Sequence, residues 1–354
     1  MGQGLAGSCL AIQLLNSGKK ILVLDEPQKN RASVVAAGLF NPITGKRMSK
    51  SWKAKEIFSY LFQFYVEAEA LLGQKFFHPQ PIYRPFISIE EQNEWMSLSE
   101  DEGIKLFIEK IFTGPSFHQS NDVYGGILIS QCGYLDVSHF MEAVRRRLKN
   151  ENSFEEIFFD VNGLTIDQAS VNYSSPSGEH VEASAIIFCD GIAANRNPLF
   201  NWLPIRPLKG ETLTVSLNER PEVIFNRGVY IVPAQENNCF RVGATYQPTD
   251  LRESVTSDAR TELEEKLKAL LKISFKIDHQ EWGIRPTSPD RKPIMGAHPI
   301  YKNVIIFNGL GTKGVSLAPY FSGVLASWLE RKSEIPKEVN IERFKALYSS
   351  LSSF

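Results

Sequence analysis

The first residues with an evident chemical use are glycines near the start of the chain. Gly2, Gly4 and Gly7 form a G-x-G-x-x-G pattern, which Leu5 and Ala6 complete. A backbone without side chains at these positions can approach a pyrophosphate closely. A helix that begins there offers free N–H groups and the positive end of its dipole. The pattern therefore predicts a phosphate-binding turn that opens a helix.

An acidic residue stands at a matching distance from these glycines. Asp25 follows the apolar run 21–24 and lies 23 positions after Gly2. A carboxylate at the end of such a strand accepts hydrogen bonds from the hydroxyls of an adenosine ribose. The alternative is a glycine-rich turn that opens an ordinary core helix. We favour a dinucleotide site, because an apolar helix, a buried strand and the acid follow the glycines in order.

A second glycine-rich loop lies near the C-terminus, between an apolar strand-like run and an apolar helix. Its candidate cofactor-binding residues are Gly309, Gly311, Thr312, Lys313 and Gly314. Two such loops favour FAD over NAD, because the second helix N-terminus can stabilise negative charge on a reduced isoalloxazine ring. The alternative is a strand–helix turn that binds no ligand.

The segment 282–296 holds three prolines and two glycines around Arg285. A rigidly held arginine beside a flavin is suited to a bidentate grip on a substrate carboxylate. The alternative is a structural ion pair. The six histidines are scattered, so none is proposed as catalytic.

Composition narrows the function classes. The chain has 354 residues, 39 lysines and arginines against 40 acidic residues, and 43% apolar residues. A near-neutral chain of this kind predicts a globular protein with no nucleic-acid partner. The four cysteines form no C-x-x-C pair, so no metal site is expected. No apolar run reaches the roughly 18 residues of a membrane span, and no signal peptide is visible. We expect a cytoplasmic protein.

The hydrophobic pattern predicts alternating helices and strands. Helices are expected at 5–15, 52–73, 89–112, 136–148, 256–272 and 315–330. Strands are expected at 21–24, 126–129, 155–160, 163–167, 170–174, 181–190, 212–215, 229–232, 240–243 and 303–307. The proline-containing residues 77–88 predict an edge strand or loop, and residues 235–238 a hairpin turn. An exposed helix face is expected to carry Arg145, Arg146 and Arg147. A solvated loop is expected to carry the basic residues Lys46, Arg47 and Lys50.

This order predicts an α/β fold with an α+β insert. A doubly wound FAD/NAD(P)-binding domain with a central parallel sheet would take residues 1–76, 134–206 and 284–354, and an antiparallel substrate-binding domain residues 77–133 and 207–283. The glycine fingerprint normally follows a strand, and here only Met1 precedes it. We therefore expect the first strand to be missing, which leaves open a degenerate fold without stable FAD.

Several further segments share a family pattern with these motifs. They are 2–25, 37–42, 133–136, 203–210, 230–233 with 243–245, 282–296 and 309–319. In order and spacing they resemble the FAD-dependent D-amino-acid oxidase superfamily, in the branch of glycine oxidase and sarcosine oxidase. The FAD domain of the enzyme that matures 5-methylaminomethyl-2-thiouridine in tRNA belongs to the same branch. The resemblance covers nearly the whole chain.

The resemblance implies roles for individual residues. Arg285 matches the arginine that holds the substrate carboxylate, Tyr230 a tyrosine of the same pocket, and Lys313 a basic residue near the flavin. Positions implied beside the cofactor are Ala37, Gly38 and Leu39, with Asp190 and Gly191 near the ribityl chain. Glycine oxidase has an arginine at the position where this chain has Thr312. The family more often has Ala-Gly where this chain has Cys189-Asp190-Gly191. No cysteine matches a flavin-linking one, so FAD is expected to bind non-covalently.

The implied activity is oxidation of the C–N bond of a small amino acid or secondary amine, by hydride transfer to the flavin N5. Oxygen or another acceptor would then take the electrons, and a homo-oligomer is possible. One alternative keeps the flavin and places the amine oxidation in tRNA modification. A nicotinamide dehydrogenase is disfavoured by the second glycine loop.

Overall fold

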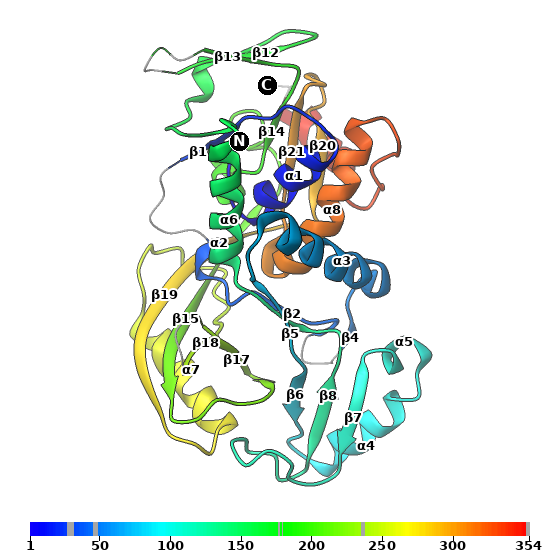
Figure 1. The fold of residues 1–354 in the computed structure, drawn as a ribbon, viewed down its shortest axis with the longest axis vertical. Coiled ribbons are helices and arrows are strands. Elements are labelled where there is room, and N and C mark those ends of the chain that lie inside the picture. Colours follow the sequence, from blue (N-terminus) through cyan, green and yellow to red (C-terminus); the bar gives the residue numbers. More distant parts are fainter. Residues whose placement is uncertain (27–31, 45–48, 176–177, 179, 235–237, 352–354) are drawn as a thin grey trace.

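The computed structural model describes residues 1–26, 32–44, 49–175, 178, 180–234 and 238–351. In Figure 1 the chain forms two lobes, and both termini lie in the upper one. Helices pack around small sheets in the upper lobe, and a large curved sheet makes up most of the lower lobe. The structure therefore has the α/β lobe and the antiparallel sheet lobe that the sequence predicts.

Two small sheets form the centre of the upper lobe. Strand β1 (Val23–Asp25) pairs in parallel with β10 (Phe154–Glu156). Strand β14 (Ile186–Phe188) pairs in parallel with β21 (Val304–Asn308), which pairs antiparallel with β20 (Ile294–Ala297). All residues of β1 and β21 are buried. The buried strands predicted at 21–24 and 303–307 are thus confirmed, within one or two residues at their ends.

Met1 and Gly2 connect these two sheets. The amino group of Met1 donates to the Ile187 carbonyl at 2.7 Å, and the Cys189 amide donates to the Met1 carbonyl at 2.7 Å. The Gly2 amide donates to the Leu24 carbonyl at 2.8 Å. The two residues therefore occupy the place between β14 and β1, and helix α1 (Leu5–Asn16) follows directly from it.

Four of the longer helices pack around these strands in the upper lobe. Helix α1 packs against α6 (Val137–Asn150) and α8 (Gly314–Leu329), and α3 (Ala54–Leu72) packs against α8. The Asp136 carboxylate caps α6 by accepting the His139 amide at 3.0 Å, at the start of the helix predicted over 136–148. The aromatic side chains of α3 face inward, and the buried Tyr65 hydroxyl donates to the Val315 carbonyl at 3.0 Å.

Eight strands form the sheet of the lower lobe, in the order β19-β15-β18-β17-β16-β6-β8-β7. They are β19 (Phe275–Thr287), β15 (Arg206–Leu217), β18 (Cys239–Gly243), β17 (Val229–Pro233), β16 (Ile224–Arg227), β6 (Ile82–Pro85), β8 (Gly126–Ile129) and β7 (Ile108–Phe112). All pairs are antiparallel except β16 with β6, which joins the two halves of the sheet.

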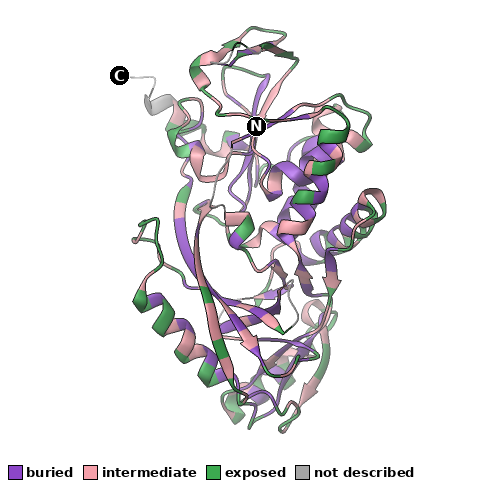
Figure 2. Cartoon of the chain, turned by 60° about the vertical axis from the view of Figure 1, so that its left-hand side comes forward, coloured by how far each residue is buried: buried purple, intermediate pink, exposed green. Residues whose placement is uncertain are grey.

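The two faces of this sheet differ. Helix α7 (Ser257–Leu270) covers the outer face, where its Leu263 and Leu267 pack with Leu213 and Val215 of β15. Figure 2 shows this lower helix with its outward residues exposed. Because side chains alternate along a strand, Gly210 and Thr212 point to the opposite, inner face. Both line the large cavity described below.

Three sequence predictions on elements are wrong in whole or in part. Within residues 77–88, β5 (Phe77–Pro79) is the edge strand of a three-stranded sheet, as predicted, but β6 lies inside the eight-stranded sheet, which tolerates Pro81 and Pro85 because they lie just before β6 and at its end. Residues 89–112, predicted as one helix, form two helices, α4 (Ile89–Leu98) and α5 (Glu102–Lys105), followed by strand β7. The strand predicted over 181–190 is two strands in different sheets, β13 (His180–Ala183) and β14.

The remaining elements are short. They are α2 (Ala32–Val35), β2 (Leu39–Phe40), β3 (Ile43–Thr44), β4 (Ser49–Lys50), β5 (Phe77–Pro79), β9 (Gly133–Leu135), β11 (Leu164–Ile166), β12 (Val171–Ser174), α9 (Lys345–Leu351), and the 3₁₀ turns η1 (Val161–Gly163), η2 (Gly191–Arg196), η3 (Gly311–Lys313) and η4 (Ile341–Phe344). Residues 46, 47 and 235–237 of the predicted basic loop and hairpin turn lie outside the described residues. Among the helices of the described ranges, none is long and apolar enough to cross a membrane. The proposed domain boundaries stay a prediction.

Candidate active site

A cavity of about 1490 Å³ lies where the two lobes meet. Sixteen of the predicted site residues line it, and they come from the start, middle and end of the chain. They are Gly2, Gly4, Leu5, Ala6, Asp25, Ala37, Gly38, Leu39, Asp190, Gly191, Tyr230, Arg285, Gly311, Thr312, Lys313 and Gly314. Gly7 and Gly309 do not line it. The fold thus gathers nearly all of the predicted residues around one space.

The N-terminal glycine turn is closely packed. Gly2 has φ +92°, and a Cβ there would lie 2.7 Å from the Cys189 carbonyl oxygen. A Cβ on Gly7 would lie 2.0 Å from the Gly2 carbonyl oxygen, so Gly7 fixes how closely α1 approaches the turn. A Cβ on Gly4 would meet only the Ser33 hydroxyl, at 3.5 Å. The turn is therefore tight on its inner side and open on the side of the cavity.

Helix α1 presents its N-terminus to the cavity without a side-chain cap from Gly4. The Leu5 amide donates to the Ser33 hydroxyl at 3.2 Å, and Gly4, Leu5 and Ala6 line the cavity. Free N–H groups and the helix dipole at such an end favour a bound phosphate.

Asp25 is held in place by two residues that sequence reasoning missed. Its Oδ1 accepts the Gln3 amide at 2.8 Å, and its Oδ2 lies 3.3 Å from Arg145 Nη2. Arg145 Nε also donates to the Gln3 side-chain oxygen at 2.8 Å. The expectation that Arg145 is only a surface residue is therefore wrong. The sequence gives no signal for this contact, because Arg145 and Asp25 are 120 positions apart.

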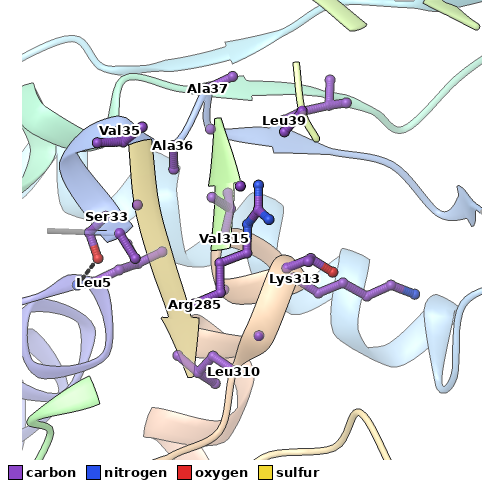
Figure 3. A pocket seen from close by; sticks show the side chains of 18 of the residues that line it. Leu5, Ser33, Val35, Ala36, Ala37, Leu39, Arg285, Leu310, Lys313 and Val315 are labelled. Atoms are coloured by element: carbon purple, nitrogen blue, oxygen red, sulfur yellow. Dashed lines mark hydrogen bonds between the residues drawn. The ribbon is translucent and has the colours of Figure 1, made fainter. Parts of the chain in front are cut away.

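The second glycine loop places another helix end at the same cavity. Helix α8 begins at Gly314 without a side-chain cap, and a Cβ on Gly314 would lie 3.3 Å from Leu5 Cδ2. The N-termini of α1 and α8 are therefore neighbours. Figure 3 shows the Lys313 side chain extending away from Arg285. Lys313 Nζ donates to the Ser51 hydroxyl at 3.0 Å, and burial lowers the pKa of this amine.

Arg285 extends from β19 into the pocket, between the 35–39 segment and Val315 (Figure 3). Its guanidinium lies over Gly210, where a Cβ would come within 2.1 Å of Arg285 Nη1. Arg285 Nη1 has one long hydrogen bond, to the Thr245 carbonyl at 3.5 Å. Burial lowers the pKa of the guanidinium, and only the phenols of Tyr230 and Tyr246 oppose this effect. None of the ion pairs found among the described residues includes Arg285, so its charge faces the cavity uncompensated.

Tyr230 lies beside this guanidinium. Its hydroxyl reaches over Gly243, where a Cβ would lie 2.8 Å away. Burial raises the pKa of the phenol, and the charges of Arg285 and Arg241 partly offset this effect. The Tyr230 hydroxyl thus remains a neutral hydrogen-bond donor near Arg285 at ordinary pH.

Asp190 is half-buried and lies two residues after the end of β14. The Asn308 side-chain amide donates to Asp190 Oδ1 at 3.1 Å, and Asn197 donates to Oδ2 at 3.4 Å. Burial raises the pKa of the carboxyl to about 6. The side chain therefore carries a proton in mildly acidic solution, unlike an exposed aspartate.

This raised pKa predicts how stability depends on pH. Between about pH 4 and pH 6 the folded protein keeps the Asp190 proton while the unfolded chain has released it, so the free energy of unfolding falls as pH rises. We expect the free energy of unfolding of Asp190→Asn to decrease over this pH range by about 1–3 kcal/mol less than that of wild type. Urea unfolding of both proteins at pH 4.5 and pH 6.5 measures the difference. Equal changes in the two proteins would contradict the prediction.

The residues of this cavity fit a dinucleotide cofactor. Two neighbouring helices turn their N-termini to one space, neither capped by its own N-cap side chain, and the glycine turn is open on that side. The buried carboxylate of Asp25 stands at the end of β1, where the ribose of such a cofactor binds. A cavity of this volume at the junction of two lobes is typical of a cofactor and substrate site.

The fold and the glycine-lined cavity are thus those of a dinucleotide-binding protein, and Arg285 gives one wall of the cavity a positive charge. Residues 1–328 match the family described as FAD dependent oxidoreductase. The chain belongs to this family, whose members depend on FAD, and the family resemblance seen in the sequence is confirmed.

Known relatives are distant but cover nearly all of the chain. A bifunctional protein ThiO/ThiG of Nostoc sp. is 25% identical over 94% of this chain and 53% of its own length. The chain spans about half the length of such bifunctional relatives. Glycine oxidase of Bacillus subtilis is 22% identical over 96% of this chain and 94% of its own.

Solved structures share the fold. Glycine oxidase from Bacillus cereus has a TM-score of 0.79 at 20% identity and covers 94% of both chains. Iminodiacetate oxidase from Chelativorans sp. has a TM-score of 0.79 at 17% identity, and covers 96% of this chain and 97% of its own.

Proposed function

We propose that this chain oxidises the C–N bond of a small amino acid or secondary amine. The observation that carries the proposal is the Arg285 guanidinium, which lies in the cavity wall and has no carboxylate partner among the described residues. A half-buried arginine without such a partner is well suited to bind a substrate carboxylate through two parallel hydrogen bonds. The match of glycine oxidase over 96% of this chain supports the same substrate class.

The chain's own residues would orient the substrate. Arg285 would hold the carboxylate, and the Tyr230 hydroxyl would donate a further hydrogen bond beside it. Gly2, Gly4 and the N-terminus of α1 would hold the pyrophosphate of FAD, and Asp25 its ribose. The N-terminus of α8 at Gly314 would lie near the flavin ring. FAD, when bound, supplies the two-electron oxidation, so the protein contributes position and charge.

We propose that FAD is bound non-covalently. Cys189 is the cysteine that lines the cavity, and burial raises the pKa of its thiol to about 12. A thiol that stays protonated is a poor nucleophile. Denaturation followed by ultrafiltration should release all of the yellow cofactor into the filtrate.

An assay of the purified, FAD-loaded protein with glycine, N-methylglycine and proline tests the proposal. The expected products are the corresponding oxo acid and amine, or the cyclic imine from proline. Hydrogen peroxide appears if oxygen is the acceptor, and an artificial acceptor dye covers the case of a dehydrogenase. A FAD-loaded protein that oxidises no carboxylated amine with either acceptor would contradict the proposal.

A second candidate is amine oxidation in tRNA modification. A tRNA 5-methylaminomethyl-2-thiouridine biosynthesis protein of Idiomarina loihiensis is 23% identical over 98% of this chain and 58% of its own length. The same assay with an unmodified tRNA and with a tRNA whose uridine carries a carboxylated amine separates the two candidates. Activity on the modified tRNA alone would favour the second.

A further inference from the structure

The cavity has a second cationic group, distant from Arg285. Arg84 of β6 and Arg227 of β16 both line it, with side chains only 15% and 18% exposed. They share one carboxylate, Glu91, at 3.7 Å from Arg84 Nη2 and 2.9 Å from Arg227 Nη1. The group therefore has two positive charges against one negative charge.

The hydrogen bonds of this group are incomplete. Arg227 Nη1 also donates to the Pro85 carbonyl at 2.8 Å, which fixes its position. Arg84 Nε is buried and has no hydrogen-bond partner among the described residues. Burial lowers the pKa of Arg84, and so does the charge of Arg227 beside it. Because Arg84 Nε is closed off from the cavity, an anionic ligand would meet the terminal nitrogens of Arg84 and Arg227, which share one carboxylate.

Sheet geometry connects this group to the substrate pocket. Tyr230 of β17 stands opposite Asn226 of β16, and the register of β16 with β6 places Asn226 beside Arg84. Residues opposite one another share a face of the sheet, so these side chains form a row along the cavity. The guanidinium of Arg285 lies over Gly210 of β15, four strands from β6. At about 4.8 Å per strand, the two cationic groups are on the order of 10 Å or more apart once their side chains are extended.

Charge differs between the two ends of the cavity. The charged lining residues at the nucleotide end are of both signs, namely Asp25, Glu26, Asp190, Arg196 and Lys313, whereas the arginines at the sheet end are Arg84, Arg227 and Arg285. Two further charged residues line the sheet end: Lys266, which pairs with Glu262, and the exposed Glu253. The sheet end is therefore positive overall and favours a ligand with more than one negative charge.

We infer that the substrate is an elongated, N-substituted amino acid with two anionic groups. Its carboxylate binds Arg285, and its N-substituent ends in a second carboxylate or similar oxyanion that binds Arg84 and Arg227. The inference rests on the proposed function, because it assumes the same amine-oxidising pocket. It adds a specificity site that a substrate as small as glycine does not reach.

Binding without turnover is the first arm of the test. Calorimetry of the FAD-loaded protein compares α,ω-dicarboxylic acids of increasing length with monocarboxylic acids of equal carbon number. We expect one dicarboxylic acid with a spacing on the order of 10 Å to bind at least about tenfold tighter than its monocarboxylic partner. An ω-phosphono carboxylic acid of the same length shows whether a phosphonate or a carboxylate is preferred. Equal affinities for all three compounds at every length would overturn the inference.

Variants assign the effect to Arg84. Arg84→Gln should remove the tenfold preference, Arg84→Lys should keep part of it, and the exposed control Arg260→Gln on α7 should keep all of it. The monocarboxylic acids should bind all four proteins equally. If Arg84→Gln weakens both compound series equally, the residue has a structural role and the inference is wrong.

Turnover is the second arm. Anaerobic flavin reduction by an N-(ω-carboxyalkyl)glycine should be at least about tenfold more efficient than by the N-alkylglycine of equal length. A preference in binding without any flavin reduction would refute the proposed function and leave the anion site standing. Reduction at equal efficiency by both compounds, with no binding preference, would refute the anion site and leave the proposed function standing.

Discussion

Replacing Arg285 with alanine is expected to lower kcat/KM for a carboxylated amine by roughly 30- to 3,000-fold. Loss of one partner from a buried, hydrogen-bonded charge pair costs about 2–5 kcal/mol, and each 1.4 kcal/mol is about tenfold. The guanidinium has no carboxylate partner of its own among the described residues, so its removal leaves no opposite charge stranded. Stopped-flow measurement of anaerobic flavin reduction gives the rate and the substrate dependence.

Three controls make this result specific. Arg285→Lys should recover only part of the activity, because an ammonium cannot form two parallel hydrogen bonds with a carboxylate. An amine without a carboxylate should react equally slowly with wild type and Arg285→Ala. The exposed Arg260→Ala should behave as wild type. An Arg285→Ala protein with unchanged kcat/KM would show that the substrate carboxylate binds elsewhere.

Gly7→Ala is expected to give protein that folds but retains less than about a tenth of the wild-type flavin. The new Cβ would lie 2.0 Å from the Gly2 carbonyl oxygen, a backbone atom that cannot move aside cheaply. Helix α1 must then shift away from the glycine turn, and the N–H groups at its N-terminus lose their alignment with the pyrophosphate. The ratio of absorbance near 450 nm, where oxidised flavins absorb, to protein absorbance measures the flavin content.

Gly114→Ala is the matched control for this variant. A Cβ at Gly114 meets no atom within 4 Å, and the residue does not line the cavity. It should retain the full flavin content, and circular dichroism should show the helix content of wild type in both variants. Full flavin content in Gly7→Ala would contradict the proposed place of the pyrophosphate.

The parts of the fold that the sequence predicted best are local ones. The glycine turn, α1 and β1 follow one another within 25 residues, and so do β21, its glycine loop and α8. Each rests on short-range rules, such as a glycine where a side chain would clash and an apolar helix that follows a buried strand. These two units also supply most of the residues that line the cofactor end of the cavity.

The errors arose where distant segments pair. Strand β6 is interior because it pairs with β16, some 140 residues later in the chain. The sequence of residues 77–88 alone does not indicate this pairing. Residues 108–112 form a strand because they pair with β8. Such pairings depend on tertiary context, which overrides local propensity.

The same limit applies to the site. Arg285 stood out because prolines and glycines surround it, but the contact of Arg145 with Asp25 joins residues 120 positions apart. Arg84 and Arg227 meet at Glu91 only through the pairing of β6 with β16. Neither arginine lies in a recognisable motif, so the second cationic group became visible only in the folded chain.

An anaerobic titration of the purified protein tests the central claim most directly. Visible spectra are recorded before and after addition of glycine, N-methylglycine and an N-(ω-carboxyalkyl)glycine, with wild type and Arg285→Ala side by side. The expected result is a flavin band near 450 nm that is bleached in wild type by at least one of these amines, and far more slowly in the variant. Protein that holds no flavin, or a flavin band that no carboxylated amine bleaches, would contradict the assignment of an FAD-dependent amine oxidoreductase.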